Sequence, residues 1–127
     1  MLFRSVSQKI IGRFLAQVFD GLVTIDPHLH RVARLEEASP VKRAITLSGA
    51  PLLGDYIARQ IPNAFLLGPD SESAQWIASA AQAHGFEHAA CEKIRRGDKD
   101  VQVQLPAVDL SGRPVVILDD EIGRAHV

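Results

Sequence analysis

The sequence contains few of the residues that mark several classes of protein. Cys91 is its one cysteine, which excludes an internal disulfide and a cysteine-rich zinc site. No apolar run approaches the ~20 residues that a membrane span needs, and no signal-peptide pattern is present. Basic and acidic residues number 14 and 15, so no strong field attracts nucleic acid or a membrane surface. These absences favour a cytoplasmic protein without a nucleic-acid or membrane partner.

What is present is the composition of a small globular protein. Of the 127 residues, 46% are hydrophobic and 23% are charged, which allows a core and argues against disorder. Apolar runs predict strands at 22–25, 43–47, 64–67, 88–91 and 115–118, and helical spacing predicts helices at 5–20, 48–61 and 71–84. This alternation predicts an α/β fold with a mainly parallel sheet and helices on both faces.

Some local features can be predicted from single residues. Ser5 is the expected N-cap of the first helix, and Gly21 suits its end. Gly85 is expected just after the last helix, and Cys91 in the core. The continuously apolar stretch 115–118 is typical of a central parallel strand, whereas alternation over 101–105 indicates a half-exposed, antiparallel strand.

Polar clusters directly follow three of the predicted strands: Asp26 with His28 and His30, then Asp70, then Asp119 with Asp120. Ligands of open parallel sheets bind outside the carboxyl ends of the strands, where these clusters would converge. Several carboxylates and a histidine suit a divalent cation with a phosphate or polyhydroxyl ligand. Asp70 could equally be the N-cap of the next helix. His28 and His30 could hold zinc or iron, although such a pair alone is a weak signal.

The stretch from Lys93 to Asp100 carries charges of both signs. We expect it to be a loop, and two interpretations remain open. One is a solvated hairpin without a function of its own. The other is a mobile basic loop that closes over phosphates, with Gly97 as its hinge.

Five segments together resemble the ribose-phosphate pyrophosphokinase family. Val23–His28 is similar to the family's V-T-V-D-x-H segment, and Ser48–Ile57 is similar to the helix that follows it. Leu67–Asp70 resembles the S-P-D turn, and Glu92–Arg95 resembles the K-x-R of the catalytic flexible loop. Val115–Asp120 resembles the strand and acidic pair of the phosphoribosyl-binding loop. Their order and spacing match over most of the chain. Pro27 departs from the family's commoner leucine, and residues 71–73 from a glycine-containing stretch.

This resemblance implies a type I phosphoribosyltransferase-like fold and a Mg²⁺-dependent reaction. The anomeric hydroxyl of ribose 5-phosphate would attack the β-phosphorus of ATP, and AMP would leave. His28 and Asp70 would bind the Mg²⁺, supported by Asp26. Lys93 and Arg95 would neutralise charge on the transferring pyrophosphoryl group. The ribose hydroxyls would be held by Asp119 and Asp120, and the full-length parent would be a homo-oligomer.

The resemblance also implies that the chain is an internal fragment. Residues 1–40 would end an N-terminal half-domain, 41–121 would belong to a phosphoribosyltransferase-like domain, and 122–127 would be a non-native tail. The tail reads Ile-Gly-Arg-Ala-His-Val, which is one reading frame of a common sequencing-library adapter. Without the 5-phosphate cradle, the fragment itself would be inactive. The alternatives are a non-catalytic synthetase-associated regulatory protein and a phosphoribosyltransferase, which would not need the basic loop.

Overall fold

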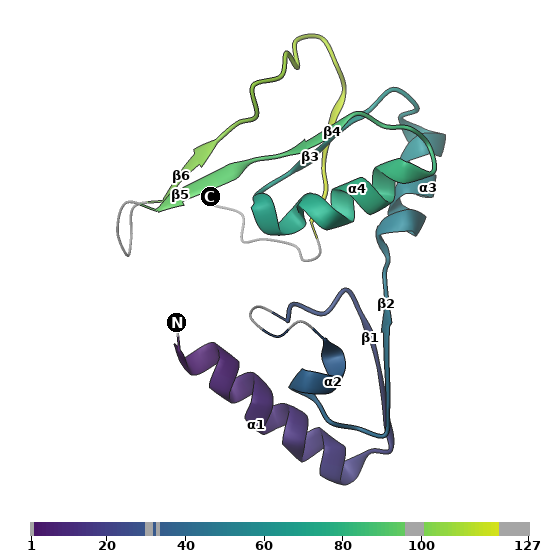
Figure 1. Ribbon diagram of the computed structural model, residues 1–127. Coiled ribbons are helices and arrows are strands. Elements are labelled where there is room, and N and C mark those ends of the chain that lie inside the picture. Colours follow the sequence, from purple (N-terminus) through teal and green to yellow (C-terminus); the bar gives the residue numbers. More distant parts are fainter. Residues whose placement is uncertain (1, 30–31, 33, 96–100, 120–127) are drawn as a thin grey trace, which may run out of the picture. The chain divides into compact units, whose positions relative to one another are not determined.

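The computed structural model describes residues 2–29, 32, 34–95 and 101–119, and only the backbone of residues 2–5, 95 and 101. The chain divides into two compact units, Met1–Gly49 and Ala50–Val127 (Figure 1). The sequence predicts a domain boundary after residue 40. The first compact unit extends past that point to Gly49 and contains the strand Arg43–Leu47. In the part of the chain that the structure describes, no helix is long and apolar enough to cross a membrane.

The first unit contains two helices and two parallel strands. Its elements are α1 (Leu2–Val18), β1 (Gly21–Ile25), α2 (Leu35–Ala38) and β2 (Arg43–Leu47). β1 and β2 pair in parallel from Gly21 opposite Arg43 to Ile25 opposite Leu47. α1 packs against α2, and just after α2 the buried Ser39 hydroxyl donates to the carbonyl oxygen of Gly12 in α1 over 3.0 Å.

The second unit contains a three-stranded parallel sheet and an antiparallel ribbon. Its elements are α3 (Ala50–Gln60), β3 (Phe65–Gly68), the 3₁₀ turn η1 (Ser71–Ser73), α4 (Ala74–Gln82), β4 (His88–Ala90), β5 (Glu92–Arg95), β6 (Val101–Gln104) and β7 (Val115–Ile117). The sheet has the order β4-β3-β7, and β5 pairs with β6. The predicted α/β class with mainly parallel strands is therefore confirmed.

β3 is the centre of this second unit. All four of its residues are buried, and the side chains of Phe65, Leu66 and Leu67 alternate between two apolar clusters. Leu66 packs with Ile77 of α4 in a cluster that also contains residues of α3. The helices α3 and α4 pack together, and both lie near β3 (Figure 1). Phe65 and Leu67 pack with Cys91, which confirms the prediction that this thiol lies in the core.

Four local predictions are wrong. α1 begins at Leu2 and ends at Val18, so Ser5 lies inside the helix and does not cap it. Gly21 begins β1, where its pairing with β2 places it in the sheet. Lys93 lies in a strand and not in a loop, because β5 pairs with β6.

The fourth wrong prediction concerns the position of β7. Within the described residues β7 pairs with β3 alone, so it is an edge strand of this sheet. Ile117 is 69% exposed. The central position belongs to β3, since it has a parallel neighbour on each side and an apolar cluster on each face.

Candidate functional site

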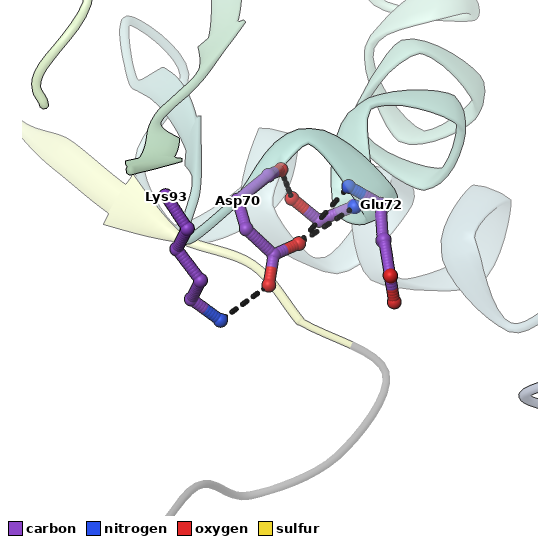
Figure 2. A network of polar contacts seen from close by, with 4 residues as sticks. Asp70, Glu72 and Lys93 are labelled. Atoms are coloured by element: carbon purple, nitrogen blue, oxygen red, sulfur yellow. Dashed lines mark hydrogen bonds and ion pairs between the residues drawn. The ribbon is translucent and has the colours of Figure 1, made fainter. Parts of the chain in front are cut away.

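Asp70 and Lys93 come together because β3 and β4 are parallel neighbours. Beyond the paired strands, the N–H of Cys91 donates to the carbonyl oxygen of Gly68 over 2.8 Å. Asp70 lies two residues after Gly68, and Lys93 lies two residues after Cys91. The two side chains point toward each other, and Lys93 Nζ lies 2.5 Å from Asp70 Oδ2 (Figure 2).

The other carboxylate oxygen of Asp70 caps the turn η1. Oδ1 accepts hydrogen bonds from the N–H groups of Glu72 at 3.0 Å and Ser73 at 3.2 Å (Figure 2). The Ser73 hydroxyl donates in return to the Asp70 carbonyl oxygen over 2.6 Å. The interpretation of Asp70 as an N-cap is therefore confirmed. The cap fixes the direction of the carboxylate, with Oδ2 turned toward the positive charge.

These contacts decide the protonation state of Asp70. Partial burial by itself raises the pKa of this carboxyl. The hydrogen bond and positive charge of Lys93, with the N–H groups of Ser73 and Glu72, outweigh that effect. The pKa of Asp70 is therefore below its usual value, and the group is ionised at neutral pH. An ionised oxygen is the ligand that a hard cation requires.

Gly68 allows the turn that carries Asp70 to fold back on β3. A Cβ at this position would lie 2.2 Å from Ser73 Oγ and 2.1 Å from Ile77 Cδ1. Both of these neighbours are fully buried. Sequence reasoning gave Gly68 no role beyond its place in the turn motif. A glycine at the end of a wholly apolar strand is nevertheless a sign of such a close approach.

Asp119 reaches the same edge of the sheet from β7. The N–H of Leu118 donates to the carbonyl oxygen of Leu67 over 3.0 Å, which extends the parallel pairing to the residue before Asp119. Asp70 and Asp119 thus follow neighbouring parallel strands, as the sequence predicts. Asp120 and the side chain of Arg95 lie outside the described part of the chain.

Asp26 and His28 belong to the first unit, at the carboxyl end of β1. The carboxylate of Asp26 bonds to the backbone of this unit, and His28 is exposed. A metal site shared by His28 and Asp70 would join the two units, so it stays a prediction. Within the described residues, no group of three or more His, Cys, Asp and Glu side chains could hold a metal ion.

The fold of the chain is that of type I phosphoribosyltransferases. It is similar to the crystal structure of phosphoribosylpyrophosphate synthetase from Mycobacterium smegmatis, with a TM-score of 0.64 and 20% sequence identity. The match covers 87% of this chain and 36% of that chain. At this identity the similarity establishes the fold alone.

Curated relatives identify the family. The chain is 31% identical over 118 residues to ribose-phosphate pyrophosphokinase 2 of Archaeoglobus fulgidus, which covers 93% of the chain and 41% of the relative. It is 32% identical over 118 residues to ribose-phosphate pyrophosphokinase of Methanosarcina mazei, covering 92% of the chain and 38% of the relative. No protein-family profile matches the chain. The chain belongs to the ribose-phosphate pyrophosphokinase family and spans less than half the length of these relatives.

Sequence reasoning missed the direct contact between Lys93 and Asp70. It assigned Lys93 to a loop over phosphates and Asp70 to a metal ion, as separate groups. The available signal was that each residue follows the end of a predicted strand by a similar spacing. Parallel pairing of those strands brings the two side chains together.

Proposed function

We propose that the full-length protein containing this chain is a Mg²⁺-dependent ribose-phosphate diphosphokinase. It would convert ribose 5-phosphate and ATP to phosphoribosyl pyrophosphate and AMP. Family membership supports this class of enzyme. The observation that carries the proposal is the meeting of Lys93 and Asp70 at the carboxyl edge of a parallel sheet, with Asp119 following the neighbouring strand. That edge is where α/β proteins bind their ligands.

The proposed reaction transfers a pyrophosphoryl group. The anomeric oxygen of ribose 5-phosphate bonds to the β-phosphorus of ATP and loses its proton, while the bond from the β-phosphorus to the bridging α-phosphate oxygen breaks. AMP leaves with that oxygen. Catalysis of such transfers depends on positioning and charge neutralisation. We assign the neutralising cations to Lys93 and Arg95, and the ribose hydroxyls to Asp119 and Asp120.

The chemistry of Asp70 fits magnesium. Its carboxylate is ionised, Oδ1 is fixed by two backbone N–H groups, and Oδ2 already meets a cation, the ammonium of Lys93. Hard, charged oxygens of this kind are what Mg²⁺ prefers. We propose Asp70 and His28 as its ligands, with Asp26 in support. Bound Mg²⁺ would neutralise and orient the phosphates of ATP. We place the parent in the cytoplasm as a homo-oligomer, without nucleic-acid or membrane partners.

The test is the replacement Lys93→Ala in the full-length parent. We expect formation of AMP from ATP and ribose 5-phosphate to fall about 100-fold or more, because a preorganised cation at the reacting phosphates is lost. Lys42→Ala is the matched control, since it breaks a Lys–Asp pair of 2.6 Å in the first unit. The control should keep wild-type turnover, and both variants should keep their melting temperatures.

Two results would favour the alternatives. Absence of AMP formation in the wild-type parent as well as in Lys93→Ala would favour a non-catalytic regulatory protein, because such a protein does not need this ammonium. Release of pyrophosphate from phosphoribosyl pyrophosphate and a nucleobase, without formation of AMP from ATP, would indicate a phosphoribosyltransferase.

A further inference from the structure

We propose that Lys93 occupies the place of the metal ion on Asp70, and that a divalent cation displaces it and thereby frees the ammonium for phosphates. This inference rests on the proposed function, because that function assigns a metal contact and a phosphate contact to these two residues. It adds that Asp70 releases Lys93 when it binds the metal ion, and that Lys93 contacts phosphates only after this release.

The geometry makes the two cations competitors for one oxygen. Asp70 Oδ1 already accepts two backbone hydrogen bonds from the turn η1. Oδ2 is the oxygen that receives the ammonium of Lys93, at 2.5 Å (Figure 2). A divalent ion on Oδ2 would lie within a few ångströms of that ammonium and would repel it. One cation therefore has to leave when the other binds.

The exposure of the pair makes exchange feasible. The side chain of Lys93 is 40% exposed and that of Asp70 is 21% exposed, so water and ions reach the contact. Ion pairs that solvent reaches are weak, because the charges are screened and the long lysine side chain loses freedom in the pair. Asp70 keeps its position without Lys93, since the backbone bonds to Oδ1 remain.

The exchange would make the β5–β6 ribbon more mobile. Lys93 lies in β5 and pairs with Val103 of β6, so its ammonium ties the ribbon to the turn η1. When the divalent cation binds Asp70, the ion pair between Lys93 and Asp70 is lost and the ribbon gains conformational freedom. The same event leaves an unpaired positive charge at the edge of the sheet, where the phosphates are proposed to bind.

The first experiment uses Mn²⁺ as a paramagnetic probe on the full chain. Bound Mn²⁺ should broaden the amide signals of Glu72 and Ser73, whose N–H groups contact Asp70. Lys93→Met should lower the Mn²⁺ concentration for half-broadening about two- to fivefold, the range expected for losing a competing exposed ion pair. Lys42→Met, the matched control, should leave it unchanged, and Asp70→Asn should abolish the broadening.

The outcomes separate this inference from the proposed function. If the Mn²⁺ concentration for half-broadening is the same in wild type and Lys93→Met, the exchange is overturned, but Asp70 remains a metal ligand. Broadening that survives Asp70→Asn, or no broadening in any variant, overturns both the exchange and the metal role of Asp70. The assay of AMP formation by the full-length parent decides the proposed function independently of either result.

Hydrogen exchange gives a second readout. Mg²⁺ should speed amide exchange at the positions of the wild-type ribbon whose N–H groups bond between β5 and β6, because the contact of Lys93 with Asp70 is released. In Lys93→Met the tie is already absent, so exchange should be faster from the start and insensitive to Mg²⁺. Wild-type exchange that Mg²⁺ leaves unchanged would overturn the inference.

Discussion

The carboxylate of Asp26 accepts a hydrogen bond from the N–H of Gly49 over 2.8 Å, which joins the end of β1 to the residue before α3. The N–H of Asp26 also donates to the carbonyl oxygen of Leu47 over 2.9 Å. Among the described residues, Asp26 is the only one other than glycine with a positive φ, at 44°. Asp26 thus has a structural role besides the support of a metal ion that we propose.

This structural role predicts different effects for two replacements of Asp26. Asp26→Ala should destabilise the chain by about 1–3 kcal/mol, because a partly buried N–H loses its acceptor and alanine disfavours the left-handed region. Asp26→Asn keeps an acceptor oxygen and tolerates that backbone, so it should cost much less. Urea unfolding measures both. Equal losses for the two variants, or unchanged amide exchange of Gly49 in Asp26→Ala, would contradict the role.

Much of the second unit could be predicted from the sequence because its strands are strongly marked. The apolar run at 64–67 lies between a proline and a Gly-Pro-Asp turn, and the structure places β3 there. The aspartate after that strand marks both the turn and the edge of the sheet. Parallel pairing then explains why Asp70 and Asp119 follow neighbouring strands.

Two features could not be predicted because they depend on contacts between distant segments. β5 reads Glu-Lys-Ile-Arg, which has no apolar pattern, and it becomes a strand by pairing with β6. The continuous apolar run at 115–118 shows that a strand is buried or paired, but it does not say which strand is central. The contact of Lys93 with Asp70 depends on the parallel pairing of β3 with β4 and on the strand β5 that follows β4.

Gly68→Ala should destabilise the second unit by about 1–3 kcal/mol, since the added methyl group overpacks a buried site. It would meet Ser73 Oγ and Ile77 Cδ1 within about 2 Å. Ile77→Val removes the second of these atoms. The loss from Ile77→Val should therefore be smaller in the Gly68→Ala background than in wild type. If the losses in free energy of unfolding of Gly68→Ala and Ile77→Val simply added in the double variant, the predicted clash would be relieved by a shift elsewhere. Urea unfolding measures these losses.

Stability should depend on pH through Glu87 and Arg113. Arg113 Nη1 donates to Glu87 Oε2 over 2.9 Å, and this hydrogen bond and the arginine charge lower the pKa of Glu87 below its usual value. A lowered carboxyl pKa stabilises the fold above the unfolded value near 4.5, and that contribution is lost as pH falls through the folded pKa.

We therefore expect Glu87→Gln to lose less stability than wild type when the pH is lowered from 6 to 3. Arg113→Met should reduce the pH dependence at least as much, because the arginine charge also lowers the pKa of Asp109, and the double variant should go no further than Arg113→Met. Arg113→Met should also lose stability at both pH values, because the guanidinium carbon lies 5.2 Å from the ring centroid of Phe65. Urea unfolding at the two pH values measures this. If the stability of Glu87→Gln depended on pH as strongly as that of wild type, the pH dependence would come from other carboxyl groups.

Asp70 and Asp119 should bind different ligands in the full-length parent, Mg²⁺ and ribose 5-phosphate, although both follow parallel strands at one edge of the sheet. Asp119→Asn removes the charged acceptor that we propose for the ribose hydroxyls, so we expect the KM for ribose 5-phosphate to rise about 10-fold or more, with a smaller change for ATP. Asp70→Asn should instead raise the Mg²⁺ concentration needed for half-maximal rate, because a neutral amide is a poorer ligand for a hard cation. Steady-state kinetics with ribose 5-phosphate, ATP and Mg²⁺ varied in turn distinguishes the two effects. If both variants raised the same constant, the carboxylates would act on one ligand, and the separate assignment of metal and ribose would be wrong.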